Sequence, residues 1–165
     1  LEKNDRSIAL KKSQNFSEKF KKYTKFKNIK VHIHTKDVHS FLRVWKPNKY
    51  GDDLSGFRKT IVWVKEHKKP LVAIELVRAG LVFRGLAPIF NENHQYIGSI
   101  EFMQGLNSIS RDLLKKDIQT LIIFKKEYLN IATLLKSKEE VMHNFVLALK
   151  KGAYDEDFYN DVKNL

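Results

Sequence analysis

Residues 40–106, which decide the fold of this 165-residue chain, read SFLRVWKPNKYGDDLSGFRKTIVWVKEHKKPLVAIELVRAGLVFRGLAPIFNENHQYIGSIEFMQGL. The stretch contains both tryptophans, all three prolines and six of the seven glycines of the chain. It also holds four of the six arginines, namely Arg43, Arg58, Arg78 and Arg84. Arginine is a planar, permanently charged donor that suits carboxylate or phosphate groups. Because these arginines lie among residues that favour strands, we expect the fold to place them, whereas the lysines of the flanks are typical of solvated surface.

Three strands follow one another in the second half of this stretch. Residues 71–77, 81–90 and 96–104 are rich in β-branched and aromatic side chains. They are separated by a three-residue turn that contains Gly80 and by the loop NENHQ (91–95). Loops this short favour an antiparallel meander, in which Gly80 supplies the positive φ of the tighter turn.

Two more strands are predicted upstream. IKVHIHT (29–35) alternates apolar and polar residues, which predicts a half-buried strand with His32 and His34 on its polar face. Residues 41–45 predict a short strand on which Arg43 shares a face with two aromatic residues. We expect Arg43 to bind a ligand or to form an ion pair, because a buried guanidinium needs a partner.

Helical patterns precede and interrupt these strands. Residues 6–27 carry an apolar stripe, have lysines over most of the remaining surface, and contain neither Gly nor Pro. This pattern predicts one long helix that ends at Asn28. A second helix is predicted from the N-cap Asp53 to Pro70, because its apolar residues are spaced by three and four.

The remainder of the chain, residues 107–165, predicts a connecting helix and part of a smaller lobe. After the helix, the apolar segments 120–124 and 128–135 predict a strand pair. A capping box at Ser137 predicts a helix to Lys151, and a short acidic helical tail follows. A strand pair alone cannot close a sheet, so we expect this lobe to be incomplete.

The net charge of +12 is concentrated near the N-terminus. Residues 1–36 hold eleven Lys and Arg against three Asp and Glu, whereas the rest of the chain holds twenty against sixteen. A basic excess on one segment is typical of a solvated face or of a membrane-proximal segment. No nucleic-acid-reading motif accompanies it, so we expect no nucleic-acid partner.

The composition limits the class of protein further. Cysteine is absent, which removes disulfides and thiol nucleophiles. The sequence contains no run of about 18 apolar residues, the length expected of a membrane-spanning helix. The chain opens at Leu1 without a signal-peptide pattern, and we expect it to be a piece of a longer protein.

The candidates for metal binding and catalysis are few. His32 and His34 have the strand spacing of two zinc ligands, but no carboxylate or Cys completes a recognised spacing. Asp52 and Asp53 are explained by a turn and a helix cap. The sequence has no nucleophile elbow, phosphate-binding loop or zinc-protease motif. We therefore predict no metal site, no cofactor and no enzymatic activity.

The acidic and basic residues of the meander suggest an ion pair. Arg84 alternates with Val82 and Leu86 in an otherwise apolar strand, and Glu101 lies in the next strand. If the hairpin places these two residues opposite each other, they form a cross-strand pair. Arg58, one residue after Phe57, can face either the sheet or the solvent.

Four segments resemble the Cache sensor family. They are H-T-x-D-x-x-S-F-L-R-x-W (34–45), G-D-D-L-S-x-F-R (51–58), R-A-G-L-x-x-R-G (78–85) and G-S-x-E-F-x-Q-G (98–105). More narrowly, the segments resemble the double-Cache type of bacterial methyl-accepting chemotaxis proteins, sensor kinases and diguanylate cyclases. The resemblance covers roughly residues 30–106.

This resemblance implies an α+β fold with a PAS-like antiparallel sheet of about five strands. The long helix (1–28) would lie on one face of this sensor lobe (29–106), and a small-ligand pocket would lie under the crossover on the other face. The resemblance also implies a periplasmic location in an inner-membrane protein, between two transmembrane helices. The positions that match the family's pocket are Arg43, Trp45, Tyr50, Arg58, Arg78, Arg84, Glu101 and Gln104.

Two functions follow as expectations. The first is a small-ligand sensor of a chemoreceptor or other signalling receptor, with an anionic ligand such as a carboxylate because the pocket is rich in arginine. The second is a structural or dimerising module without a ligand, in which Ala9, Phe16 and Phe20 of the N-terminal helix associate with a second copy.

Overall fold

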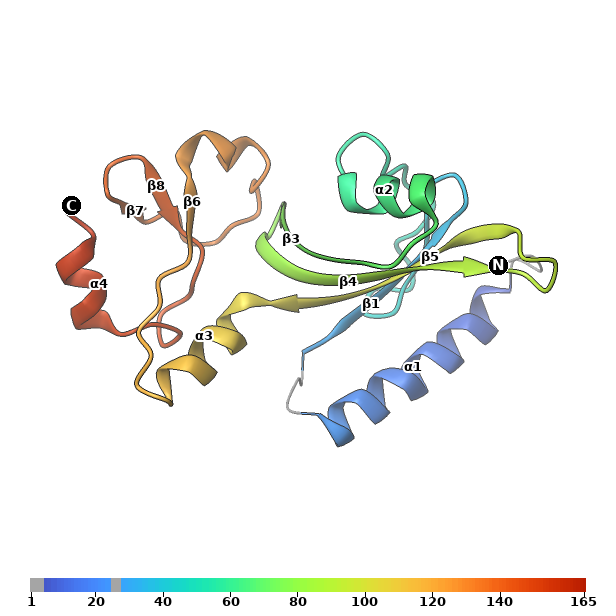
Figure 1. The fold of residues 1–165 in the computed structure, drawn as a ribbon, viewed down its shortest axis with the longest axis horizontal. Helices are drawn as coiled ribbons and strands as arrows, with labels where there is room; N and C mark the ends of the chain where they lie inside the picture. The colour runs from blue at the N-terminus through green and yellow to red at the C-terminus, as the bar shows by residue number, and fades with distance from the viewer. Residues whose placement is uncertain (1–4, 25–27) are drawn as a thin grey trace. The chain divides into compact units, whose positions relative to one another are not determined.

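The computed structural model describes residues 5–24 and 28–165, and it divides the chain into two compact units (Figure 1). The sheet unit comprises Leu1–Ala73 and Phe83–Gln104. The C-terminal unit comprises Ile74–Val82 and Gly105–Leu165. In the described residues the strands form one sheet of five and one of three, which confirms the predicted α+β class.

The larger sheet is antiparallel, and its strand order is β2-β1-β5-β4-β3. The predicted meander is confirmed almost residue for residue, and Gly80 has the predicted positive φ of 105°. The strands are β1 (Lys30–Thr35), β2 (Ser40–Arg43), β3 (Leu71–Val77), β4 (Gly80–Phe90) and β5 (Tyr96–Gly105).

Strand β1 is buried on both faces, so the predicted half-buried strand is wrong. Its residues 31–34 are all buried, including His32 and His34. The alternation of apolar and polar residues is real, but a second layer covers the polar face, and the histidines there are hydrogen-bonded to other buried groups.

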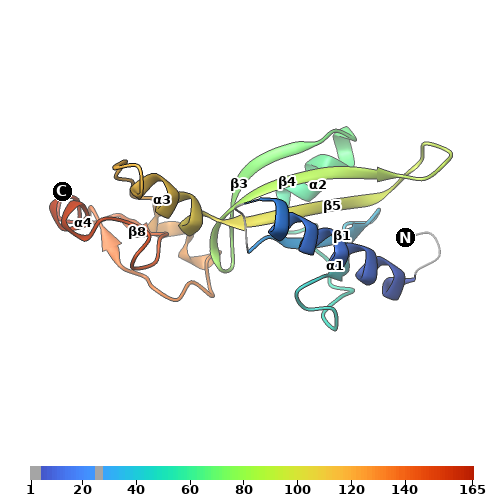
Figure 2. The same ribbon diagram turned by 90° about the horizontal axis from the view of Figure 1, so that it is seen from below.

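Helix α1 (Arg6–Tyr23) covers one face of this sheet, and α2 (Lys59–His67) covers the other (Figures 1 and 2). The Asp5 carboxylate caps α1 by accepting from the backbone N–H groups of Ser7 and Ile8. The helix is capped at Thr24; the predicted extension through residues 25–27 lies outside the described residues. Phe16 packs on Phe102 of β5, with ring centroids 5.3 Å apart.

Helix α2 begins five residues later than predicted. The Asp53 carboxylate accepts from the N–H of Ser55 at 2.8 Å, which forms a local turn instead of a helix cap. Leu54 is drawn into the core with Val38, Ile61, Val64 and Leu86. As a result, Arg58 and not Asp53 occupies the N-cap position of the helix.

Two predictions for the C-terminal unit are wrong. Instead of a strand at 128–135, the chain forms a 3₁₀ helix and a turn. Instead of a helix at 137–151, it forms a hairpin of β7 (Glu140–Val141) and β8 (Phe145–Leu147). Positive φ angles of 51° at Met142 and 61° at His143 turn the chain where the helix was expected. The hairpin adds two strands to β6, and the sequence pattern revealed neither of them.

Buried apolar side chains organise this unit around Val141, Leu147 and Tyr154. The short acidic helix at the end of the chain is present as predicted. No helix in residues 5–24 and 28–165 is both long enough and apolar enough to cross a membrane. The elements are α3 (Leu106–Leu114), β6 (Ile123–Lys125), η1 (Lys126–Asn130), β7 (Glu140–Val141), β8 (Phe145–Leu147) and α4 (Glu156–Val162).

Candidate functional site

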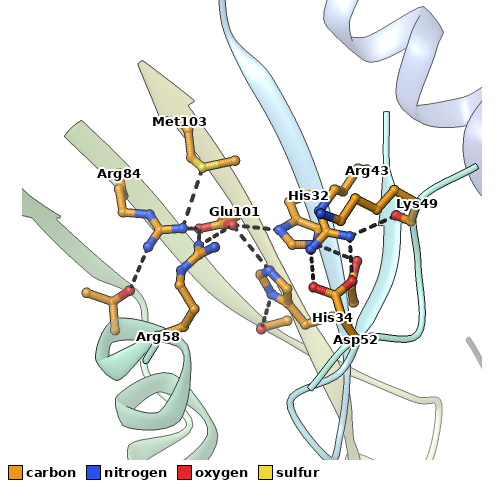
Figure 3. Close-up of polar contacts among 12 residues, drawn as sticks. His32, His34, Arg43, Lys49, Asp52, Arg58, Arg84, Glu101 and Met103 are labelled. Carbon is orange, nitrogen blue, oxygen red and sulfur yellow. Dashed lines mark hydrogen bonds and ion pairs between the residues drawn. The ribbon is translucent and has the colours of Figure 1, made fainter. Parts of the chain in front are cut away.

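The fully buried carboxylate of Glu101 lies at the centre of a polar cluster in the sheet unit (Figure 3). Its Oε1 atom is 2.6 Å from Arg58 Nη2, 2.9 Å from His32 Nδ1 and 3.2 Å from His34 Nε2. Its Oε2 atom accepts from Arg84 Nη2 and, at 2.9 Å, from Arg58. The carboxylate is thus surrounded by donors, as a buried carboxylate must be to remain ionised.

Strand pairing explains why these side chains meet. In the β1–β5 ladder His32 lies opposite Glu101, and His34 lies opposite Ser99. Strand β4 lies on the other side of β5 and supplies Arg84, while the N-cap of α2 supplies Arg58. Successive residues of a strand alternate between faces, so these groups lie together on the face that α2 covers.

The ionised state of Glu101 follows from these contacts. Burial alone would raise the pKa of Glu101, but hydrogen bonds from His32 and His34 and the charge of Arg58 hold this pKa well below its usual range. Burial also lowers the pKa of Arg58, and the charge of Glu101 opposes this effect.

Both buried histidines are neutral. Burial, the largest effect, lowers the pKa of His32 to about 4 although the hydrogen bond to Glu101 opposes it. Burial lowers the pKa of His34 in the same way. Neutral rings satisfy the geometry if each donates one N–H to Glu101 and accepts from a serine with its other nitrogen: Ser40 Oγ lies 2.8 Å from His32 Nε2, and Ser99 Oγ lies 2.9 Å from His34 Nδ1.

Arg84 is confirmed as the cross-strand partner of Glu101. Its side chain is fully buried, donates to Thr60 Oγ1 at 3.2 Å and contacts Met103 Sδ at 3.5 Å. Arg58 binds the same carboxylate, so two guanidinium groups donate to Glu101.

Arg43 forms a second, adjacent ion pair. It binds Asp52 through two parallel hydrogen bonds of 2.7 Å each, and it donates to the Lys49 carbonyl at 2.8 Å. The hydrogen bond from Arg43 lowers the pKa of Asp52. The sequence predicted a partner for Arg43 but assigned Asp52 only to a turn.

The remaining predicted positions divide between the two units. Trp45 lies edge-on to His32, with ring centroids 5.7 Å apart, beside the cluster. Tyr50 is 56% exposed in the crossover segment, residues 46–53. Gln104 is buried, but strand alternation places it on the α1 face. Arg78 belongs to the C-terminal unit, where its carbonyl accepts from Leu134 N–H at 2.7 Å.

Sequence reasoning did not assign His32, His34 and Asp52 to the site. The shared strand face of His32 and His34 was the signal for the two histidines, and the pairing of β1 with β5 was the missing step. Nothing local marked Asp52, because its partner Arg43 is nine residues away and a turn already explained the acid.

The ligand atoms of His32, His34 and Glu101 lie within 4.8 Å of one another, a spacing at which three side chains can hold a metal ion. The guanidinium groups of Arg58 and Arg84 hydrogen-bond to the same carboxylate and oppose a divalent cation there. We therefore assign the cluster as an ion-pair network.

A comparison with known families identifies the fold. Residues 1–142 match the family model dCache_3, described as the double sensory domain of two-component sensor kinase. The chain belongs to this Cache family. The expected resemblance to the Cache family is confirmed. Cache domains of sensor kinases are sensory domains that are typically extracytoplasmic. No curated protein sequence matches this Cache domain.

Proposed function

We propose that this Cache domain is the periplasmic, ligand-binding part of an inner-membrane signalling receptor, and that its ligand is a small organic anion such as a carboxylate. The observation that supports the anion is that three buried arginines, Arg43, Arg58 and Arg84, lie in the sheet unit. An anion bound beside them would accept charge-assisted hydrogen bonds, so ligand binding would stabilise the sheet unit.

The crossover segment is the proposed lid. Arg43 holds it to β2 through Asp52, and Arg6 of α1 holds it through the Tyr50 ring and the Pro47 carbonyl. A ligand carboxylate competes with Asp52 for Arg43, and release of Asp52 moves the segment against α1. In the full-length receptor that shift would pass to the flanking transmembrane helices, provided that the ligand binds the two states with different affinity.

A thermal-shift screen tests the proposal. Small mono- and dicarboxylates and amino acids are added to the purified chain, and a ligand at about 100 times its dissociation constant should stabilise the fold by about 2.7 kcal/mol. Arg43→Ala should abolish the shift, whereas Arg111→Ala, an exposed arginine of the C-terminal unit, should retain it. If no anion raises the melting temperature, the ligand-binding proposal is wrong.

A second candidate, a dimerising module, is favoured by exposed apolar side chains on α1. Ile8, Phe16 and Tyr23 are each about half or more exposed, at 55%, 48% and 73%. Of the three predicted contact residues, Ala9 packs toward the sheet core, and Phe16 and Phe20 both contact the Phe102 ring within the chain. Concentration-dependent dimers in sedimentation equilibrium, without any response to small anions, would favour this candidate.

A further inference from the structure

The hydrogen bonds of His32 link Glu101 of β5 to the first residue of β2. Each imidazole bridges Glu101 and a serine, and for His32 that serine is Ser40, the first residue of β2. Ser40 also joins the crossover segment, because its N–H donates to Asp52 O at 3.0 Å and its carbonyl accepts from Gly51 N–H at 2.8 Å. One hydrogen-bond chain thus runs from Glu101 to the crossover.

Strand β2 is a short edge strand of the sheet. In the described chain it is four residues long, lies at one end of the strand order and pairs with β1 alone. The ladder is irregular between Ile33 and His34, so that Phe41 has no direct partner across from it. Opening of this edge would admit water to His32.

Burial is the largest effect that opposes the addition of a proton to either histidine, whereas Glu101 favours it and the nearby arginines oppose it. His32 lies near Glu101 of β5, Arg43 of β2 and His34 of the same strand β1. His34 faces Glu101, Arg58 from the start of α2 and Arg43. Beyond these groups, Arg84 of β4 binds Glu101, and Asp52 of the crossover binds Arg43. Because burial disfavours an imidazolium and the nearby arginines add to this effect, an added proton is stable only where water can reach the ring.

We propose that the sheet unit is a proton-responsive switch, in which protonation of His32 and His34 releases β2 and the crossover segment from β1. This input is independent of the proposed organic anion, because it needs only the groups within the cluster. The exposed His67, which stacks on Trp63, lies outside it. An extracytoplasmic sensor built in this way would respond directly to acid.

Trp45 provides an optical test, because its ring lies edge-on to His32 and a protonated imidazole quenches indole emission. In a Trp63→Phe background the emission of Trp45 is recorded between pH 7.5 and 3.5, together with hydrogen exchange of residues 40–53. We expect quenching and loss of amide protection to occur together near pH 4, while residues 145–149 of the C-terminal unit keep their protection. His32→Gln should remove the quenching step, and the matched control His67→Gln should retain it.

Two results would overturn the proposal. The first is a Trp45 step that survives in His32→Gln, and the second is a step without increased exchange in residues 40–53. If His32→Gln does not fold, NMR titration of the histidine rings of the unmodified chain tests the proposal instead. Rings of His32 and His34 that titrate near pH 6.5, or that titrate without any change at β2, would contradict the switch.

Discussion

The guanidinium carbon of Arg6 lies 3.3 Å from the centroid of the Tyr50 ring. The same side chain donates through Nε to the Phe41 carbonyl at 3.0 Å and through Nη2 to the Pro47 carbonyl. The first residue of α1 is therefore attached to β2 at Phe41 and to the crossover segment at Pro47 and Tyr50. A movement of this loop acts directly on the helix.

Replacing Arg6 by Ala should loosen the crossover without unfolding the chain. The variant loses a cation–π contact and the hydrogen bonds to the two carbonyls, so we expect a loss of about 1–3 kcal/mol in the free energy of unfolding. Urea unfolding measures this loss, and faster amide exchange should be confined to residues 41–50. Lys11→Ala on the exposed side of α1 is the control, and an equal effect in both variants would contradict the attachment.

Glu101→Gln should be among the most destabilising substitutions in the chain. The amide is the same size as the carboxylate, but it leaves the guanidinium groups of Arg58 and Arg84 buried without their counter-charge. The expected loss is about 3–5 kcal/mol of unfolding free energy, against less than about 0.5 kcal/mol for the exposed control Glu66→Gln.

A double variant separates charge from packing in this experiment. Arg84→Met together with Glu101→Gln removes one of the two uncompensated charges, and it should be more stable than Glu101→Gln alone. If the double variant is less stable by the full sum of the two single losses, charge balance is not what stabilises the cluster.

The sequence predicted the sheet unit well because its signals are local. Gly80, the NENHQ loop and the β-branched runs specify the meander without reference to the rest of the chain. The partner of Arg84 was also predictable, because a hairpin places nearby residues opposite each other. The contacts of Glu101 with His32 and Arg58 span 69 and 43 residues, and the order of strands that creates them is not encoded in any local pattern.

The C-terminal unit was harder to predict for a different reason. Residues 137–151 have good helix-forming composition and a capping box, but Val141, Val146 and Leu147 are buried in a sheet. Burial of these side chains outweighs a helix preference of a few tenths of a kcal/mol per residue. Met142 and His143 adopt positive φ angles in the turn, although neither residue type indicates such a turn in a sequence.

The free energy of unfolding of the sheet unit should decrease as the pH is lowered. The pKa of His32 is about 4 in the folded chain and near its ordinary 6.5 in the unfolded chain, so the unfolded chain binds more protons between these values. The free energy of unfolding is therefore constant above about pH 6.5 and decreases as the pH falls toward 4, by about 3 kcal/mol from His32 alone. Glu101, whose folded pKa is lowered, adds a further loss as the pH falls below the ordinary pKa of a glutamate.

Urea titrations at several pH values measure this dependence. Both tryptophans lie in the sheet unit, so their fluorescence reports its unfolding. His32→Gln should flatten the slope between pH 6.5 and 4.5. A stability that does not change over this interval in the unmodified chain would show that the histidines are not held neutral by the fold.

Gly80→Ala should destabilise the C-terminal unit. Gly80 has φ of 105°, a conformation that strains any residue with a Cβ, and a Cβ built there lies 3.0 Å from Leu135 Cδ1. We expect a loss of about 1–3 kcal/mol, visible as faster exchange of the Leu135 amide, which donates to the Ala132 carbonyl at 3.0 Å. Gly85→Ala in the same strand is the matched control, because a Cβ at Gly85 meets nothing within 4 Å. Equal exchange rates in the two variants would mean that the turn tolerates a side chain at Gly80, and that neither the positive φ nor the contact with Leu135 limits the stability of this unit.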